Sequence, residues 1–413
     1  MTTDPAKPMD RPVPPGANAW GPATSVGQAT VTEAVRAQDP GPVIALRTVI
    51  GKSLDDLSTP AVLVDLDVLE RNVARMAARA REAGVRLRPH AKTHKSPHIA
   101  RLQRAAGAWG LSVAKVGEAE VFADAGFDDL FVAFPVVGED KGRRLLALAD
   151  RVRIAVGVDS LEGAATLARP FRAAGQALDV LLKVDVGYGR VGVTPDRAVE
   201  VARGVSGLAG LRLRGVFTHA GHGYLADTKA SVGEIARLEG LRLAEAASEL
   251  RAAGLAIEEV SVGSTPTAAE AMRVAGVTEC RPGNYVFHDA SQVALGTCRP
   301  EDCALTIVAT VVSVPAPDRA VVDAGSKTLS SDPLRPRPGG YGQVLGRASR
   351  IESLSEEHGV ISVVEGESFR VGERVRLLPN HACVVANLHD RLIGVSGNQV
   401  EAVLTVAARG RVR

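Results

Sequence analysis

The sequence predicts an α/β protein in which an eight-stranded parallel (β/α) barrel is joined to a second, mostly antiparallel β domain. Three observations lead to this class. The chain has 413 residues, more than one hydrophobic core usually serves. From Pro60 onward, short β-branched runs alternate with amphipathic segments, as in parallel βαβ units. After about residue 300 the helical period fades, and alternating β patterns separated by turns remain.

The first 42 residues differ from the rest of the chain. They contain eight of the 23 prolines and show no apolar period. Such a segment cannot bury enough apolar surface to fold alone. We therefore expect residues 1–42 to be a disordered Pro-rich tail without chemistry.

Nine apolar runs are expected to be strands of the first part. They cover residues 61–66, 85–88, 109–113, 129–134, 152–156, 178–184, 211–217, 257–262 and 285–287. Helical segments lie between them, and in residues 68–84 the side chains of Leu69, Val73, Met76 and Ala80 share one face. A barrel uses eight of the nine runs, and the apolar pattern does not say which run is extra.

The part after residue 300 predicts the β domain. Alternating patterns cover residues 309–314, 319–325, 358–364 and 373–385. Turn residues separate these runs, and little helical period interrupts them.

Composition excludes several classes of function. Lys plus Arg number 49 against 47 acidic residues, and aromatic residues are 3% of the chain, so neither charge nor stacking favours nucleic acid. Four cysteines are too few for a disulfide framework, which favours a reducing compartment. No apolar run approaches the roughly 20 residues of a membrane helix, and no export signal opens the sequence. We expect a cytoplasmic protein that binds neither nucleic acid nor membrane.

The segment RPHAKTHKSPH, residues 88–98, places three histidines among basic residues. A metal stripe on a helix, a basic patch and a catalytic lysine are the three interpretations. Pro89 disfavours helix before it, and Pro97 suits the first turn of a helix capped by Ser96. The three histidines therefore cannot share one helical face.

The position of this segment, directly after the run 85–88, supports the interpretation of a catalytic lysine. In a parallel barrel, the carboxyl ends of strands form the catalytic rim. Lys92 is thus placed for chemistry, although a solvated basic loop remains the alternative. Further polar motifs follow other strands on the same rim. They are Asp185 and Arg190 in DVGYGRVGV, Thr218, His219, His222 and Tyr224 in THAGHGY, GSTPT at 263–267, and RPGNY at 281–285.

Two of these motifs suit a phosphate. GSTPT offers a glycine, hydroxyls and free backbone amides, and RPGNY supplies a second Gly-Asn turn after the next strand. The last barrel loops are a usual phosphate position. Ordinary turn chemistry is the alternative for GSTPT alone.

The β domain carries a histidine and a cysteine two positions apart, His381 and Cys383. In a strand, residues i and i+2 point to the same side, so the two side chains would converge on one Zn²⁺. A buried cysteine beside a packing histidine is the alternative. Lys327 is a rival for the nucleophilic lysine, and the loop with Glu356, Glu357 and His358 receives no role.

Together these motifs carry a family resemblance. RPHAKTHK, VDVGYGRVGV, FTHAGHGY, GSTPT, RPGNYVF, DAGSK, LSEEHG and PNHACVVAN, in order over roughly residues 58–400, resemble the D-serine dehydratase and D-threonine aldolase family. These are metal-dependent pyridoxal-phosphate enzymes of the alanine racemase fold type, fold type III. The motifs are closest to those of D-serine dehydratase.

The resemblance implies a role for each matching residue. Lys92 would form the Schiff base with pyridoxal 5'-phosphate, Arg190 would approach its phenolic oxygen, and His219 would lie behind its ring. The remaining cofactor contacts would come from Tyr224, Ser264, Thr265, Gly283 and Asn284, the last four at the phosphate, and from Arg281 near the pyridine nitrogen. Such an arginine would make the ring a poorer electron sink. His381 and Cys383 would hold Zn²⁺ or another divalent metal.

The resemblance also implies the domain division and the assembly. The barrel would span 67–290, and residues 43–66 plus 291–413 would form the β domain that carries the metal ligands. The run 61–66 would then join the β domain and leave eight barrel strands. The protein would be a homodimer with its site near the interface.

The predicted reaction is elimination of water from a D-β-hydroxy amino acid, converting D-serine to pyruvate and ammonia, with D-threonine or 3-hydroxyaspartate as further substrates. The triplet His381-Ala382-Cys383 resembles that of dehydratases, whereas the aldolases mostly show His-Cys-Asp. A D-threonine aldolase producing glycine and acetaldehyde is the alternative. An amino-acid racemase and a non-catalytic pyridoxal-phosphate-binding protein are less favoured.

Overall fold

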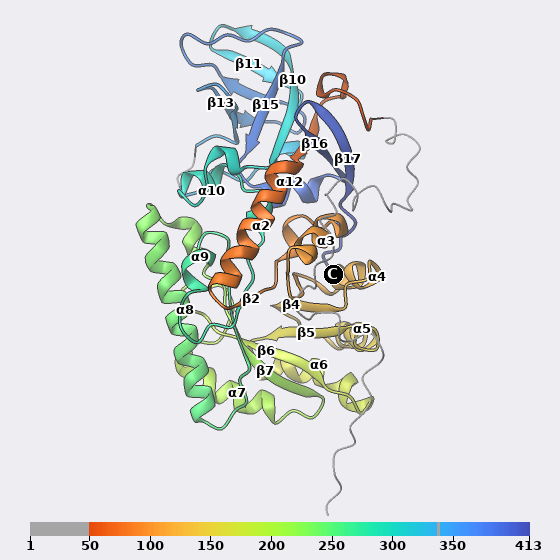
Figure 1. Ribbon diagram of the computed structural model, residues 1–413, viewed down its shortest axis with the longest axis vertical. Helices are drawn as coiled ribbons and strands as arrows, with labels where there is room; N and C mark the ends of the chain where they lie inside the picture. Colours follow the sequence, from red (N-terminus) through yellow and green to blue (C-terminus); the bar gives the residue numbers. More distant parts are fainter. Residues whose placement is uncertain (1–48, 337–338) are drawn as a thin grey trace, which may run out of the picture.

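The computed structural model describes residues 49–336 and 339–413. The tail predicted for residues 1–42 lies outside these described residues. Within them, two sheets organise the chain, and Figure 1 shows one above the other.

Eight parallel strands form the first sheet of the described chain, in the order β2-β9-β8-β7-β6-β5-β4-β3. They are β2 (Arg86–Leu87), β3 (Leu111–Val113), β4 (Asp129–Pro135), β5 (Arg153–Val158), β6 (Leu178–Lys183), β7 (Leu211–Phe217), β8 (Glu259–Val262) and β9 (Glu279–Cys280). A parallel bridge between His90 and Ser112 joins β2 to β3 and closes the barrel. The predicted fold class is confirmed.

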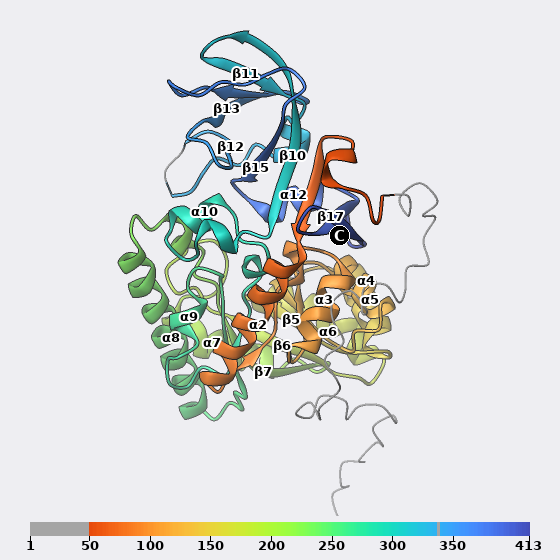
Figure 2. The ribbon, with the colours of Figure 1, turned by 45° about the horizontal axis from the view of Figure 1, so that its top comes forward.

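Helices surround this barrel (Figure 2). They are α2 (Leu66–Glu82), α3 (Pro97–Ala105), α4 (Val116–Asp124), α5 (Glu139–Ala149), α6 (Leu161–Ala173), α7 (Ala198–Ser206), α8 (Lys229–Ala252) and α9 (Ala268–Ala271). The predicted face of α2 is buried as expected, with Leu69, Val73, Met76 and Ala80 all at most 5% exposed. Ser96 is the N-cap residue of α3, but its hydroxyl makes no capping hydrogen bond.

The second sheet is the nine-stranded, mostly antiparallel sheet of the β domain, in the order β11-β14-β13-β12-β15-β10-β1-β16-β17 among the described residues. Its strands are β1 (Ala61–Asp65), β10 (Leu305–Ala316), β11 (Arg319–Val322), β12 (Gly342–Val344), β13 (Arg350–Leu354), β14 (Gly359–Ser362), β15 (Arg374–Pro379), β16 (Arg391–Ser396) and β17 (Gln399–Thr405). Strand β1 therefore belongs to this sheet and not to the barrel. Short helices α10 (Ala290–Ala294), α11 (Ser326–Leu329) and α12 (Ala382–Leu388) accompany it.

One predicted strand was wrong. Residues 285–287 do not form a strand, since Asn284–Val286 is a 3-10 helix, and the eighth barrel strand is the two-residue β9. Tyr285 and Phe287 are buried, so the run is apolar because its side chains fill the core. A short apolar run does not distinguish strand from helix by itself.

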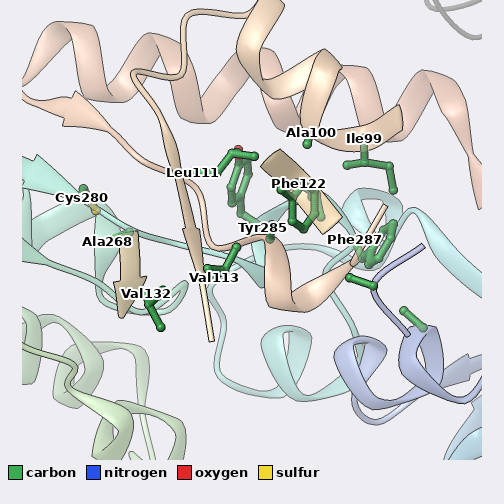
Figure 3. Packing of buried hydrophobic residues seen from close by; sticks show 14 of the residues in the cluster. Ile99, Ala100, Leu111, Val113, Phe122, Val132, Ala268, Cys280, Tyr285 and Phe287 are labelled. Carbon is green, nitrogen blue, oxygen red and sulfur yellow. The ribbon is translucent and has the colours of Figure 1, made fainter. Parts of the chain in front are cut away.

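The side chains of Tyr285 and Phe287 are part of the hydrophobic core. Figure 3 shows Tyr285 and Phe287 packed with Ile99, Leu111 and Phe122 from three other elements. Each of these side chains is at most 2% exposed. The segment that follows β9 is therefore held by packing against α3, β3 and α4, which fixes the backbone of the RPGNY turn.

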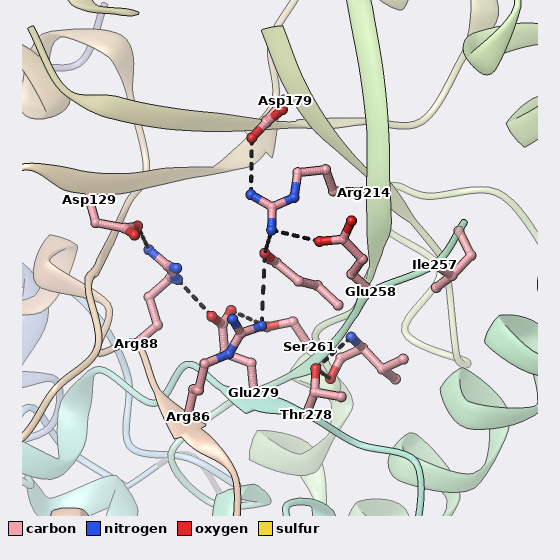
Figure 4. A network of polar contacts seen from close by, with 12 residues as sticks. Arg86, Arg88, Asp129, Asp179, Arg214, Ile257, Glu258, Ser261, Thr278 and Glu279 are labelled. Carbon is pink, nitrogen blue, oxygen red and sulfur yellow. Dashed lines mark hydrogen bonds and ion pairs between the residues drawn. The ribbon is translucent and has the colours of Figure 1, made fainter. Parts of the chain in front are cut away.

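A buried ion network crosses the barrel interior (Figure 4). The guanidinium of Arg88 donates to Asp129 and, over 2.7 Å, to Glu279. The other Glu279 oxygen accepts a 2.6 Å hydrogen bond from the Ser261 hydroxyl, which also contacts Arg281. The network thus connects the barrel interior to a residue assigned to the site.

No helix in residues 49–336 or 339–413 combines the length and apolar character needed to cross a bilayer. The four cysteines are free.

Candidate active site

A cavity of about 710 Å³ lies between the barrel rim and the β domain. It brings together every residue that the sequence assigned to the site. The lining includes Lys92, Arg190, His219, Tyr224, Ser264, Thr265, Arg281, Gly283, Asn284, His381 and Cys383. Since these residues span nearly 300 positions, their convergence is a property of the fold.

Lys92 sits in the 3-10 turn Ala91–Thr93 directly after β2. The Nδ1 atom of His90, the N-cap residue, accepts its backbone N–H at 3.5 Å. Burial lowers the pKa of the Lys92 amine; Arg190 and Arg281 act in the same direction, and Cys383 opposes them. The environment therefore favours a neutral, nucleophilic amine.

His219 follows β7 and has a fixed tautomer. Its Nδ1 donates a 2.7 Å hydrogen bond to the carbonyl of Gly263, which leaves Nε2 as the acceptor. Burial, together with Lys92 and Lys183, lowers the pKa of His219 well below its usual value. The ring is thus neutral near pH 7.

Arg190 lies in the glycine-rich loop after β6. Asp185 shapes this loop by accepting the amides of Gly187, Tyr188 and Gly189 at 2.9–3.0 Å. The Arg190 guanidinium then stacks over the Tyr188 ring at 4.9 Å from its centroid. Asp185 therefore positions the arginine through the loop backbone.

The segments 263–267 and 281–285 form a cradle of unpaired donors. No hydrogen bond in the described part of the chain uses the backbone amides of Ser264, Thr265, Gly283 or Asn284. The buried Thr265 hydroxyl also has no partner. A Cβ at Gly283 would lie 2.6 Å from Thr93 Oγ1, so only glycine fits this approach. Such a cradle suits a phosphate.

Glu239 on α8 supports the cradle from behind. Its buried carboxylate accepts the Thr267 hydroxyl at 2.6 Å, the Gly263 amide at 3.1 Å and the Ala220 amide at 3.3 Å. Burial raises the pKa of Tyr224, and the nearby Cys383 and Asp289 act in the same direction. The rim loops after β7 and β8 are therefore tied to one another.

Two hydrogen bonds hold the Arg281 guanidinium. One terminal nitrogen donates to the Ser261 hydroxyl and the other to the Thr218 carbonyl, whereas Nε has no partner among the described residues. The charge lies 5.3 Å from the centroid of the Phe217 ring. Burial lowers the pKa of Arg281, while Glu279 and Cys280 oppose this shift.

The histidine and cysteine converge by a different route from the one expected. Strand β15 ends at Pro379, so His381 and Cys383 are not in a strand: His381 is the N-cap of α12, and Cys383 lies in its first turn. Burial opposes protonation of His381, but the nearby Cys383 and the hydrogen bond that the imidazole donates to Asp332 raise its pKa well above the usual value. The two side chains thus line the same cavity from the start of one short helix.

Asp332 orients the histidine. His381 Nδ1 donates to Asp332 Oδ2 over 2.6 Å, which leaves Nε2 as the nitrogen available to a metal ion. Cys383 also contacts Thr93 Oγ1 at 3.4 Å, next to Lys92. No group of three or more His, Cys, Asp or Glu residues suited to a metal occurs in residues 49–336 and 339–413. A metal here would rely on two protein ligands.

Several residues of the cavity were not predicted from the sequence. Lys183, Tyr188, Asp289 and Asp332 line the cavity. The sequence did carry a signal for Lys183, which is a basic residue at the carboxyl end of the mostly apolar strand β6. The rival Lys327 is absent from the lining and is 59% exposed, paired with Glu356 and Glu357.

The three histidines of the 88–98 segment do not form a metal stripe. His90 caps the turn that holds Lys92, whereas the buried His94 contacts Gln103 Oε1 through Nε2 at 3.2 Å. His98 lies in α3. The helical metal site is therefore excluded by the geometry, as Pro89 and Pro97 predicted.

Comparisons with known proteins agree with this architecture. Residues 64–291 match the family model of the alanine racemase N-terminal domain, and residues 304–395 match a putative serine dehydratase domain. The chain is 38% identical to D-threo-3-hydroxyaspartate dehydratase of Delftia sp. (strain HT23), over 86% of this chain and 96% of the relative. It is 35% identical to D-threonine aldolase of Arthrobacter sp., over 87% of this chain and 95% of that enzyme.

Solved structures show the same relationship. D-threonine aldolase from Filomicrobium marinum superposes with a TM-score of 0.82 at 35% identity, covering 88% of this chain and 99% of that one. The barrel, the β domain and the cavity between them define a protein with the alanine racemase fold. Within that class, the chain belongs to the D-serine dehydratase, D-threonine aldolase and D-threo-3-hydroxyaspartate dehydratase family.

Proposed function

We propose that this protein is a lyase that uses pyridoxal phosphate and a divalent metal ion to remove water from a D-β-hydroxy amino acid. The observation that carries the proposal is one cavity that holds a half-buried lysine, a cradle of unpaired donors, and a histidine and a cysteine two positions apart. The relatives named dehydratases and aldolases support a lyase.

Lys92 would hold the aldehyde carbon of pyridoxal phosphate. When bound, this cofactor acidifies the Cα proton of an attached amino acid. Because burial lowers the pKa of Lys92, its amine would be available to hold the cofactor and to accept a proton from the substrate Cα.

The rest of the cofactor would be held by residues of the barrel rim. The amides of Gly283 and Asn284, with Ser264 and Thr265, would bind the phosphate. The neutral His219 would pack behind the ring, with Arg190 near the phenolic oxygen and Tyr224 beside the cradle. The Arg281 guanidinium is held by Ser261 and Thr218, and its Nε, which has no partner among the described residues, would be free to donate to the pyridine nitrogen.

His381 Nε2 and Cys383 Sγ would hold the metal ion, which supplies a Lewis acid for the departing β-hydroxyl. A neutral imidazole and a thiolate favour Zn²⁺. Histidine-to-alanine and cysteine-to-alanine variants of the D-threo-3-hydroxyaspartate dehydratase have been solved, the latter in a metal-free form. The substituted residues in that enzyme are two positions apart, as His381 and Cys383 are here.

D-Serine would give pyruvate and ammonia, and D-threonine or D-threo-3-hydroxyaspartate would enter the same chemistry. The 38% identical relative supports the hydroxyaspartate as a substrate, whereas a D-serine dehydratase of Dictyostelium discoideum is 30% identical. Lys115 and Arg335 line the cavity and offer positive charge to a second carboxylate.

An aldolase that cleaves D-threonine to glycine and acetaldehyde is the second candidate. Its support is the 35% identity to D-threonine aldolase, in sequence and in structure. The triplet His381-Ala382-Cys383 favours dehydration. The likeness to alanine racemase of Clostridium difficile, at 15% identity and a TM-score of 0.62, concerns the fold alone. The homodimer and the cytoplasmic location stay predictions.

Product analysis tests the proposal. Purified protein with pyridoxal phosphate and Zn²⁺ would receive D-serine, D-threonine and D-threo-3-hydroxyaspartate separately, with and without a chelator. Chelator-sensitive keto acid and ammonia are expected. Glycine and acetaldehyde from D-threonine, without keto acid from any substrate, would assign the chain to the aldolases.

Two lysine variants test the nucleophile. Lys92→Ala is expected to abolish turnover and covalent capture of the cofactor. Lys327→Ala removes the exposed rival and should leave both unchanged. Turnover that survives in Lys92→Ala would show that the assigned nucleophile is wrong.

A further inference from the structure

The buried carboxylate of Asp289 lies where the barrel rim meets the β domain. It is the N-cap residue of α10 and is 1% exposed. Its Oδ1 accepts the backbone N–H of Gln292 at 3.0 Å. Its Oδ2 accepts two further donors, Asn284 Nδ2 at 2.6 Å and the Ala382 backbone N–H at 3.0 Å.

The two donors on Oδ2 come from the two halves of the site. Asn284 belongs to the cradle assigned to the cofactor phosphate. Ala382 is the residue between His381 and Cys383, and its amide fixes the turn that presents both side chains. A single oxygen atom is therefore shared by segments 98 positions apart along the chain.

A second contact from α10 holds the other side of the same turn. The Ser291 hydroxyl donates to the Asn380 carbonyl over 2.8 Å, directly before His381. The first turn of α10 thus binds the backbone on both sides of the histidine. Among the described residues, the Ser291 hydroxyl is hydrogen-bonded to Asn380 and to the Arg335 backbone but to no residue of the cradle, so Ser291, unlike Asp289, contacts only the metal-binding side.

We propose that Asp289 is a positioning residue that couples the cofactor-phosphate cradle to the metal-binding turn, so that both sites weaken together when its shared oxygen is lost. This inference rests on the proposed function. A carboxylate is needed because its oxygens only accept, and Oδ2 here accepts twice. In asparagine the amide group would place a donor against either the Gln292 N–H or the Asn284 and Ala382 donors.

The same contact orients Asn284. Because Asp289 can only accept, the Asn284 amide must turn its Nδ2 toward it, and Oδ1 is left as the buried atom without a partner. An acceptor oxygen repels a phosphate. Asn284 would therefore bind the phosphate through its backbone N–H, and Asp289 sets this arrangement.

The test compares Asp289→Asn with two other variants of the full chain. Zn²⁺ affinity is measured by competition with a chelator, and pyridoxal-phosphate affinity by dialysis and absorbance; neither readout is turnover. Asp289→Asn is expected to weaken both affinities, that for Zn²⁺ by about 10- to 100-fold, as for other residues that orient metal ligands. Ser291→Ala should weaken only Zn²⁺ binding. Asp65→Asn, at a helix N-cap outside the cavity, should change neither affinity.

The outcomes separate this inference from the proposed function. Wild-type protein that binds neither group would overturn both. Wild-type protein that binds both, with Asp289→Asn changed in neither affinity or in only one, would overturn the coupling. Should Asp289→Asn fail to fold, as judged by circular dichroism, an unchanged Zn²⁺ affinity in Ser291→Ala would overturn the role of α10.

Discussion

Replacing Arg88 by methionine should sharply destabilise the barrel. Arg88 is 5% exposed and is the partner of two buried carboxylates, Glu279 at 0% and Asp129 at 7% side-chain exposure. Methionine keeps the aliphatic volume but removes the charge and both hydrogen-bonded contacts. Removing one partner of a buried ion pair costs about 3–5 kcal/mol because it leaves an uncompensated charge.

The structure shows which of the two carboxylates accounts for most of this loss of stability. Asp129 retains Arg153 at 3.4 Å, so Glu279 carries most of the loss. In the wild-type protein Glu279 is buried, which opposes ionisation, but Arg88 and the hydrogen bond from Ser261 lower its pKa. Without Arg88, burial would raise the pKa of Glu279 above its unfolded value. The folded variant would then bind more protons than the unfolded chain, so its stability must fall as pH rises.

Urea unfolding followed by tryptophan fluorescence and circular dichroism measures this effect. The loss should be larger at pH 8 than at pH 5, and the double variant Arg88→Met/Glu279→Gln should recover part of it. Arg143→Met is the matched control, because its pair with Glu139 is exposed and should change the unfolding free energy by less than about 0.5 kcal/mol. A loss in Arg88→Met below about 1 kcal/mol, or one independent of pH, would refute the reasoning.

Three further predictions concern the cavity. Asp332→Asn weakens the orientation of His381, so Zn²⁺ affinity in chelator competition should fall about 10- to 100-fold; an unchanged affinity would argue against the assigned ligand. Gly283→Ala brings a Cβ to 2.6 Å from Thr93 Oγ1, so pyridoxal-phosphate affinity by dialysis should fall while Zn²⁺ binding persists. Burial and nearby cations lower the pKa of Lys183 to about 7, so the unfolded chain binds more protons above that pH. The cofactor-free protein should therefore gain up to about 1.4 kcal/mol per pH unit above pH 7, a slope that Lys183→Met removes.

Much of the site could be predicted because parallel strands place their carboxyl ends on one edge. Lys92, Arg190, His219 and Ser264 each follow a strand, and this position alone assigns them to the rim. The helical period of residues 68–84 likewise predicts α2. These inferences need only local pattern and one rule of barrel topology.

Other features lack a local signal. Strand β9 has two residues, one of them the charged Glu279, whose burial depends on Arg88 from another strand. The start of α12 after Pro379 follows from packing against the barrel rim, so the strand inferred for His381 was wrong. Asp332 and His381 are 49 positions apart, and Asp289 and Ala382 are 93 apart. Contacts over such distances depend on the complete fold.

The basic residues that line the cavity indicate which kind of ligand it favours. Lys92, Lys183, Arg190 and Arg281 line one cavity, and their mutual repulsion contributes to the lowered pKa of both lysines. The buried carboxylates Glu239 and Glu279 are engaged in holding loops and Arg88, so they offset this charge only in part. An anion in the cavity would therefore be attracted by the guanidinium groups of Arg190 and Arg281, and it would favour the protonated form of the lysines. This favours a phosphate-bearing cofactor and a carboxylate substrate over a neutral ligand, while Asp289 and Asp332 keep the histidine–cysteine turn beside the same cations.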